Sequence, residues 1–431
     1  MGWNIAHENF WKPLENTVNT LKLRASYGSL GNQNIDNWYQ TYSTVAYNSV
    51  AGAWLQGGKK TNITAAPGLV SAALGWEKVE SYDVGLDWGA FNNRLTGSFD
   101  YYVRNTKDMV GPAPELPALL GTDVPKTNNT DLRTTGWELQ IGWRDHLENG
   151  LNYGVTFNVS DAQAKVTRYP NNPTGSLSSY IENRKVGEIW GYETIGIAKT
   201  NDEMNQHLAT LPNGGQSQLG DKWAAGDIMY KDLDGDGKIS NGSNTLADHG
   251  DLKVIGNKTP RYLFGLDLTA SWKGFDFRAF MQGVMKRDYS DAKEFLFGTT
   301  DSGVWWAAGI TGVQDYFRDS ETWSVKNGYE SENLNAYLPR PQYSGKNIQP
   351  QTRYLLNAAY LRMKNLQIGY TLPQSLVSKA GLGNVRFFVS AENLFTITDL
   401  PSQFDPETID TDYGNGYPLS RTFSFGVNVT L

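Results

Sequence analysis

Apolar and polar side chains alternate with a period of two residues along much of the chain. Between residues 21 and 27, Leu21, Leu23, Ala25 and Tyr27 alternate with lysine, arginine and serine. Such alternation is the pattern of a β-strand whose two faces meet different surroundings. The same pattern recurs at 82–88, 95–103, 137–143, 153–159, 262–272 and 423–431. It predicts an all-β protein.

Ten strands are predicted from this pattern: 21–31, 76–89, 93–105, 133–145, 151–165, 260–273, 274–288, 358–372, 385–398 and 420–431. They are roughly 10 to 14 residues long, whereas strands of globular sheets usually have about 5 or 6. A strand that crosses a membrane at a tilt of about 45° needs roughly 9–11 residues. Tryptophan and tyrosine stand near many strand ends, as in the aromatic girdles of membrane barrels. Length and aromatic placement favour a membrane barrel over a soluble sandwich or propeller.

The connections between these strands alternate between short and long. Short turns are expected at 91–94, 146–150, 273–274 and 373–384, and long polar loops at 32–75, 105–132, 166–259, 289–357 and 399–419. Outer-membrane barrels have tight periplasmic turns and large extracellular loops. The fold class is therefore predicted as an antiparallel transmembrane β-barrel portion with long extracellular loops. Residues 1–12 are expected to be the tail of a preceding strand, and a change of parity between Met363 and Leu366 predicts a bulge.

Composition excludes several other kinds of protein. The net charge of −7 argues against nucleic acid as a partner, because phosphate binding requires a basic face. The absence of cysteine excludes disulfides and thiolate metal sites. The chain has no run of 18 apolar residues, so no transmembrane helix is predicted. The first residues lack the basic and apolar regions of a secretory signal, so the signal peptide of an exported protein would be missing here.

The stretch YKDLDGDGKIS, residues 230–240, resembles the start of a calcium-binding loop. Asp232, Asp234 and Asp236 occupy alternate positions, Gly237 permits a sharp turn, and the Lys238 carbonyl takes the seventh position. Calcium takes six to eight oxygen ligands, which alternate carboxylates on such a loop supply. The twelfth position falls on Ser243, which cannot bind in a bidentate manner. The alternative interpretation is a solvated Asp-Gly turn without an ion.

The remaining candidate chemistry is sparse. No Ser-His-Asp arrangement stands out, and we expect neither an enzyme nor a cofactor beyond a structural Ca²⁺ ion. Aromatic residues gather in the predicted 289–357 loop, where flat rings with polar edges suit sugar faces and protein partners alike. The alternative is that these rings pack the loop itself. The candidates for contact with a ligand or partner are Trp305, Trp306, Trp323 and Tyr337.

Several phrases resemble one known family in the order in which that family has them. They are LKLRASYGSLGNQNI, GDIMYKDLDGDGKIS, VIGNKTPRYLFGLDL, KGFDFRAFMQG, YLRMKNLQIGYTLP, VRFFVSAENLFTITDL, FDPE and YPLSRTFSFGVNVTL. The chain is similar to the C-terminal half of SusC/RagA-type TonB-linked outer-membrane transporters. In that family an acidic residue precedes the phrase that VIGN resembles. Asp251 takes that place here and joins the candidate calcium ligands.

The resemblance implies a 22-stranded barrel that imports glycan or peptide fragments across the outer membrane of a Gram-negative bacterium. It also implies a SusD-like surface lipoprotein as a lid, an N-terminal plug that closes the barrel, and a TonB complex that acts through a TonB box. Signal, plug and the first half of the barrel are absent from residues 1–431. An open sheet leaves two edges that lipid cannot satisfy, so the chain is expected not to transport anything alone. The alternative is a secreted, calcium-stabilised β-sheet protein that binds or degrades carbohydrate.

Overall fold

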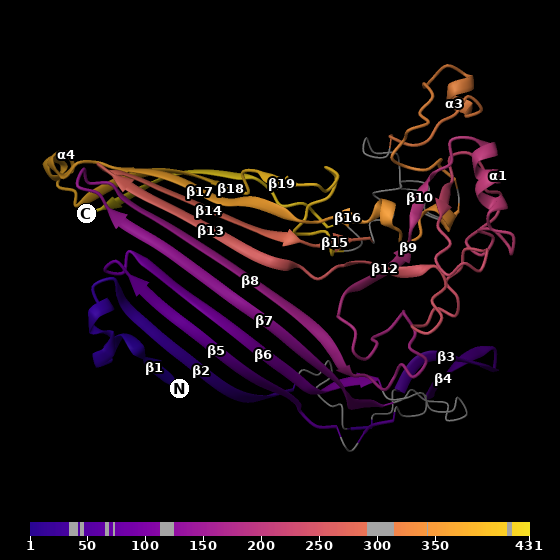
Figure 1. The fold of residues 1–431 in the computed structure, drawn as a ribbon, viewed down its shortest axis with the longest axis horizontal. Helices are drawn as coiled ribbons and strands as arrows, with labels where there is room; N and C mark the ends of the chain where they lie inside the picture. Colours follow the sequence, from indigo (N-terminus) through magenta and orange to yellow (C-terminus); the bar gives the residue numbers. More distant parts are fainter. Residues whose placement is uncertain are drawn as a thin grey trace.

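Ten long strands form one antiparallel sheet in the order of the sequence (Figure 1). The computed structural model describes residues 1–33, 42–43, 47–64, 69–71, 74–112, 125–290, 314–342, 344–411 and 416–431. The ten strands are β2 (Val18–Asn32), β5 (Glu77–Ala90), β6 (Leu95–Pro112), β7 (Lys126–His146), β8 (Asn152–Arg168), β13 (Arg261–Trp272), β14 (Phe275–Lys286), β17 (Tyr360–Thr371), β18 (Asn384–Glu392) and β20 (Thr422–Thr430). In the described residues the sheet begins at the short β1 (Gly2–Asn4), which pairs with β2, and ends at β20. The predicted fold class is confirmed.

Tight turns lie at one end of this sheet and the long connections at the other (Figure 1). The β13–β14 turn consists of Lys273 and Gly274, both with positive φ, and a left-handed run of Phe91, Asn92 and Asn93 follows β5. Two-residue turns with positive φ match the twist of the strands that they join. Between β17 and β18 the turn holds α4 (Gln374–Val377) and η8 (Ser378–Ala380). The predicted alternation of short and long connections is therefore present.

Several strand boundaries differ from the predicted ones. Strands β6 and β7 extend to residues 112 and 126, well beyond the predicted ends at 105 and 133. Hydrophobic alternation stops where both faces meet water, but the backbone ladder continues. The predicted strand 385–398 is divided into β18 and β19 (Thr396–Thr398), with a left-handed Asn393 between them. Of residues 1–12, only β1 pairs as a strand, and η1 (Ile5–His7) and η2 (Asn9–Leu14) follow it.

The predicted bulge is present in β17. The register with β14 shifts where Phe280 pairs with Asn365 but Met281 pairs with Met363, which leaves Lys364 as the extra residue. Lys364 Nζ contacts the Glu407 carboxylate at 3.0 Å. The guanidinium of the nearby, buried Arg362 contacts Asp405 at 2.8 Å. The bulge thus joins the sheet to the last long connection.

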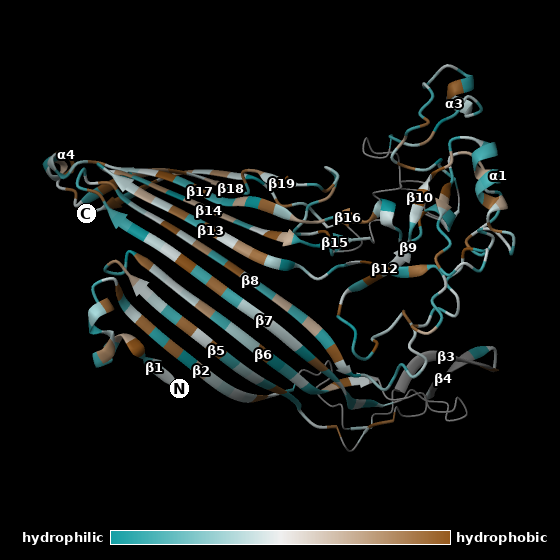
Figure 2. Cartoon of the chain, in the orientation of Figure 1, coloured by the Kyte–Doolittle hydropathy of each residue, from teal (hydrophilic) through white to brown (hydrophobic). Residues whose placement is uncertain are grey.

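The two faces of the sheet differ in polarity, as the alternating colours along the strands show (Figure 2). On one face, large apolar side chains are exposed, including Ile141 at 38% and Phe425 at 72%. No second sheet covers this face in the described part of the chain. The opposite face carries ion pairs that cross between strands, such as Arg24 with Asp87 and Asp100. The apolar face has the character of a surface that meets lipid.

The described helices are short, and none of them has the length and apolar character needed to span a membrane. They lie in or next to the connections rather than in the sheet. A separate hairpin, β3 (Tyr47–Gln56) with β4 (Lys59–Thr64), belongs to the first long connection.

Three of the predicted loops fold together into one unit, which we call the loop body and define as residues 188–257, 314–342, 344–357 and 399–411. It contains β9 (Glu188–Tyr192), β10 (Thr194–Ile197), α1 (Asn201–Ala209), β11 (Ile228–Tyr230), β12 (Leu252–Asn257), α3 (Trp323–Lys326), η6 (Gly345–Asn347), η7 (Thr352–Tyr354) and β16 (Leu356–Asn357), and β15 (Asp288–Tyr289) pairs with it. Its core joins side chains from all three loops: Tyr192, Leu211, Ile228, Tyr230, Ile239, Leu252, Leu338, Tyr354, Leu356, Leu400, Phe404 and Ile409. These connections are thus a folded structure with a hydrophobic core of its own.

Glycines allow bulky groups to lie flat on both faces of the sheet. The Trp88 ring covers Gly97 on the neighbouring strand, and a Cβ at that position would lie 2.1 Å from the ring. On the polar face, a Cβ at Gly85 would lie 2.2 Å from Asp100 Oδ1, within the Arg24 ion pairs. A side chain at either position would displace its neighbours. Gly28, in β2, has open space instead.

We predict that Gly97→Ala destabilises the sheet by roughly 1–3 kcal/mol, the usual cost of overpacking, because the rigid indole cannot retreat without losing its contacts. The measurement is the midpoint of thermal unfolding in detergent. Gly28→Ala is the matched control and should change the midpoint little. Equal midpoints for the two variants would contradict the packing of Trp88 on Gly97.

Candidate functional site

The loop that resembles a calcium site is held by hydrogen bonds from its own backbone amides to the side chain of Asp232. Asp232 Oδ1 accepts from the Gly235 amide at 2.6 Å, and Asp232 Oδ2 accepts from the Gly237 amide at 3.0 Å. Both glycines have positive φ, near 78°, which side-chain-bearing residues seldom adopt. The D-G-D-G spacing therefore folds the chain tightly around the Asp232 carboxylate.

Three carboxylates of this region lie close together. Oxygens of Asp232, Asp234 and Asp251 are within 4.8 Å of one another. Asp251 is fully buried, and its two oxygens accept from the amides of Leu233 at 2.6 Å and Ser240 at 2.8 Å. Burial raises the pKa of Asp251, and the neighbouring charges of Asp234 and Asp232 raise it further. A cation among these oxygens would remove that repulsion.

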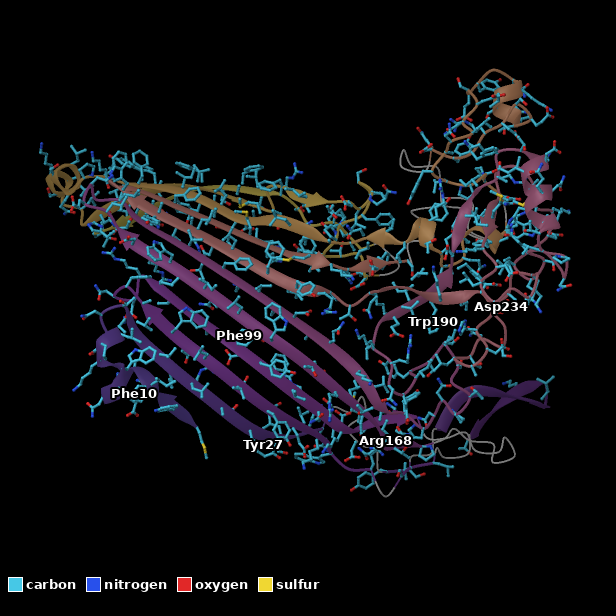
Figure 3. All side chains as sticks on the ribbon, viewed as in Figure 1. Phe10, Tyr27, Phe99, Arg168, Trp190 and Asp234 are labelled. Atoms are coloured by element: carbon cyan, nitrogen blue, oxygen red, sulfur yellow. The ribbon has the colours of Figure 1, made fainter. Side chains whose placement is uncertain are left out.

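The other two predicted ligands lie differently. The Asp236 carboxylate is outside this group of three and contacts Lys238 Nζ at 3.1 Å. The backbone of Lys238 bridges to Gly215, which follows α1. The structure thus brings together three of the predicted residues, and their oxygen donors suit a hard divalent cation such as Ca²⁺. Figure 3 labels Asp234 in the loop body, away from Phe99 on the sheet.

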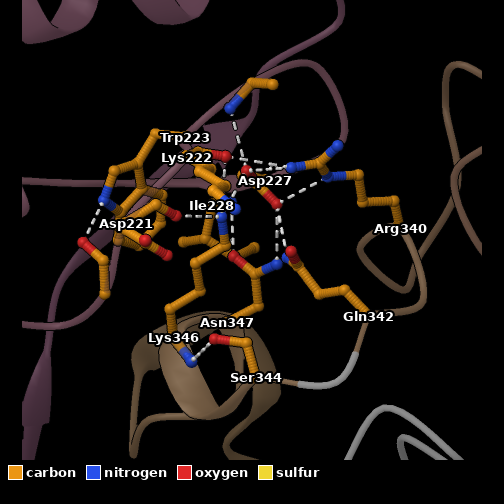
Figure 4. A network of polar contacts seen from close by, with 12 residues as sticks. Asp221, Lys222, Trp223, Asp227, Ile228, Arg340, Gln342, Ser344, Lys346 and Asn347 are labelled. Atoms are coloured by element: carbon orange, nitrogen blue, oxygen red, sulfur yellow. Dashed lines mark hydrogen bonds and ion pairs between the residues drawn. The ribbon is translucent and has the colours of Figure 1, made fainter.

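A buried ionic network centred on Asp227 joins the two longest loops (Figure 4). Asp227 is fully buried. Its carboxylate accepts from Arg340 Nε and Nη2 at 2.9 Å, from Lys346 Nζ at 2.9 Å and from Asn347 Nδ2 at 3.0 Å. Gln342 Nε2 donates to it at 2.6 Å. One carboxylate of the 166–259 loop therefore binds four side chains of the 289–357 loop.

Electrostatics explain why this network is ionised. Burial alone would raise the pKa of Asp227, but the hydrogen bonds from Arg340 and Asn347 outweigh it and lower the pKa below its ordinary value. Burial lowers the pKa of Lys346, whose Nζ also donates to the carbonyls of Asp221 at 2.9 Å and Lys222 at 3.1 Å. Removing one partner of such a buried pair leaves an uncompensated charge, which is costly.

The Asp227 network was not among the predicted site residues. Its sequence signal is weak: a single aspartate between AAG and IMY. A charge inside such an apolar stretch indicates a buried partner. That partner lies more than a hundred residues away, however, and nothing in the local pattern identifies it.

The predicted aromatic contact residues have different settings. Trp305 and Trp306 lie outside the described residues. Trp323, at the start of α3, is 70% exposed and stacks on Tyr329 with 5.4 Å between the ring centroids. Tyr337 instead packs edge-on against the buried Tyr354, also at 5.4 Å. Trp323 is therefore available for contact, whereas Tyr337, which is 37% exposed, also contributes to the packing of the loop body.

Comparison with known proteins gives a consistent result. A family model described as TonB dependent receptor-like, beta-barrel matches residues 10–394. TonB-dependent receptor P3 of Formosa agariphila is 31% identical over 454 residues, an alignment that covers 100% of the chain and 41% of that relative. TonB-dependent receptor SusC of Bacteroides thetaiotaomicron is 24% identical and is covered to 39% of its length.

Among solved structures, the RagAB peptide transporter is similar in fold. The TM-score is 0.72 at 24% sequence identity, and the match covers 100% of the chain and 43% of that structure. The chain thus spans about two fifths of the length of these relatives. Because the family match includes nine of the ten long strands, the chain belongs to the TonB-dependent receptor-like β-barrel family of outer-membrane proteins.

Proposed function

We propose that the chain forms the C-terminal barrel wall and outer loops of a receptor that imports nutrient oligomers, either oligosaccharides or peptides. The observation that carries the proposal is the sheet itself, with an exposed apolar face, an ion-paired polar face and a folded loop body beyond its outer end. A sheet with these two faces divides lipid from a wet interior. A secreted soluble protein would have to cover the apolar face.

The nature of the cargo and the partners belongs to the same proposal. The similar RagAB structure is named a peptide transporter. The exposed Trp323–Tyr329 pair of this chain suits a sugar ring as well as a protein surface. A SusD-like lipoprotein would cap the loop body, and a TonB complex would supply the energy. We expect Ala in place of Trp323 to weaken contact with cargo or lid, and Tyr337→Ala to act through folding of the loop body.

Uptake tests the proposal directly. We expect a bacterium that lacks the receptor gene to lose growth on one pool of oligomers, either glycan fragments or peptides, and to regain it when the gene is restored. The measurement is growth with each pool as the only carbon source, together with the amount of receptor in the outer membrane. Unchanged growth on both pools, or receptor that is soluble without detergent, would refute import.

We predict that Asp227→Asn loosens the loop body while the sheet stays folded. The buried Lys346 ammonium loses its counter-charge, at a cost of roughly 3–5 kcal/mol. Limited proteolysis should then cut within 188–257 and 314–342, and uptake should fall. Lys326→Gln is the control, because its partner Glu321 is exposed and such pairs contribute less than about 1 kcal/mol. Equal protease resistance in both variants would contradict the coupling of the two loops.

We further propose that Asp232, Asp234 and Asp251 bind a structural divalent cation, with Ca²⁺ as the expected ion. Their converging oxygens and the burial of Asp251 support it. Extracellular calcium is abundant enough for weak sites. The ion would stabilise the loop body and would take no part in catalysis.

We predict that millimolar Ca²⁺ raises the unfolding midpoint of the loop body and that Asp251→Asn removes this increment. Asp236→Asn, outside the group of three, should reduce it less. Because the pKa of Asp251 is raised, its ionisation costs stability above that pKa when no cation is present, and protonation relieves the cost as the pH falls. Protons compete with the cation, so the Ca²⁺ increment should shrink through the same range. An increment that survives in Asp251→Asn would place the ion elsewhere.

A further inference from the structure

Three basic residues lie side by side at the outer end of the sheet, and we call Arg133, Lys165 and Lys185 the basic row. Arg133 of β7 is the register partner of Lys165 of β8. Lys165 in turn pairs with Lys185, in the segment that continues the sheet beyond β13. All three side chains are exposed. Arg168, labelled in Figure 3, marks this outer end of β8.

The basic row lies on the apolar face of the sheet. Going outward from the membrane band, the pairs are Ile141 with Phe157, Leu139 with Val159, Trp137 with Asp161, Thr135 with Gln163, and then Arg133 with Lys165. The register is unbroken over this stretch, so all these side chains point to one face. Arg133 lies four residues beyond Trp137 along β7. For a strand tilted by about 45°, this places the basic row about 9 Å above Trp137 along the membrane normal. Lipid headgroups occupy the region just outside the hydrocarbon.

The three positive charges oppose one another directly. The Val166 amide donates to the Arg184 carbonyl and the Val186 amide to the Ala164 carbonyl, which makes Lys165 and Lys185 a non-hydrogen-bonded pair. Side chains of such pairs are the closest across a sheet, and like charges there destabilise it. Arg133 Nε donates to the neutral Asn105 at 2.9 Å. Within the described ranges, no carboxylate pairs with any of the three.

Neighbouring strands show how this chain compensates like charges elsewhere on the same face. Lys78 and Lys107 are also register partners, and Glu80 bridges them, with both ammonium groups at 2.7 Å from its oxygens. Other carboxylates near the basic row are bound elsewhere: Asp131 and Asp108 bind Arg168, Glu188 binds Arg184, and Glu182 accepts from the Tyr169 amide. A carboxylate thus accompanies each of these neighbouring groups of cations but not the basic row.

We propose that the basic row binds the phosphate groups of a phosphate-bearing lipid of the outer leaflet. Phosphate oxygens would bridge the two ammonium groups, and the remaining guanidinium N–H groups of Arg133 would bind bidentately. The membrane source follows from position, because the row continues the lipid-facing surface above Trp137. The inference rests on the place of the family in the outer membrane and is independent of the cargo that the receptor imports.

The test measures lipid binding to the receptor purified in detergent. Diphosphorylated lipid A in mixed micelles should raise the unfolding midpoint by a few degrees and should remain bound through purification. The triple variant R133Q/K165Q/K185Q should bind at least tenfold less, and without lipid its midpoint should equal or exceed that of the parent, since the repulsion is gone. A control with the same change of charge, K22Q/R104Q/R144Q, alters exposed residues of the polar face and should retain binding.

Three outcomes would overturn the proposal. Dephosphorylated lipid A that binds equally well would show that acyl chains alone are recognised. Inorganic phosphate that gives the same shift at equal phosphate concentration would show a site for a soluble anion. Equal loss of lipid in the basic-row variant and in the polar-face control would show an effect of total charge. A receptor that binds lipid A but supports growth on neither pool of oligomers would contradict the proposed import and leave the lipid site unaffected.

Discussion

Lipid offers no hydrogen-bond partner to a peptide group, and the architecture of this chain follows from that constraint. A strand in lipid must bond its backbone to a neighbour along its whole membrane-crossing length. Each of the ten long strands, from β2 to β20, pairs with its neighbours in antiparallel fashion. The register shifts at a few positions, as in β17 and β2. Side chains are then left to adapt each face to its surroundings, which they do by alternating in polarity.

This constraint explains how much could be predicted. The strands, their order and the ends at which turns and long loops lie follow from a period of two, because the polarity of each side chain indicates the face of the sheet on which it lies. The register shift at Lys364 was visible for the same reason, as a change of parity. The outer ends of β6 and β7 were not, because above the membrane both faces meet water and the alternation disappears while the ladder persists.

The loop body obeys different rules, and its contacts could not be read from the chain. Its core brings together residues from three connections that the barrel strands separate, so no local period marks it. The spacing of Asp232 and Asp234 was predictable because it lies within one turn. The partnership of Asp227 with Lys346 was not, since it depends on how two independent loops pack. Sequence patterns report local geometry well and long-range pairing poorly.

The bulge in β17 has a consequence for how the chain tolerates change. Leu366 and Ile368 lie on the apolar face below Lys364, and Leu361 and the buried Met363 lie on the same face above it, although the two pairs differ in parity. The bulge absorbs one surplus residue, so that both pairs keep the same face and Arg362 turns inward to Asp405. Deleting Lys364 would leave a regular ladder in which Leu361, Met363, Leu366 and Ile368 alternate without interruption, so each side chain would keep its face. Loss of that one codon would therefore remove the Lys364–Glu407 contact and spare the division between the apolar and polar faces.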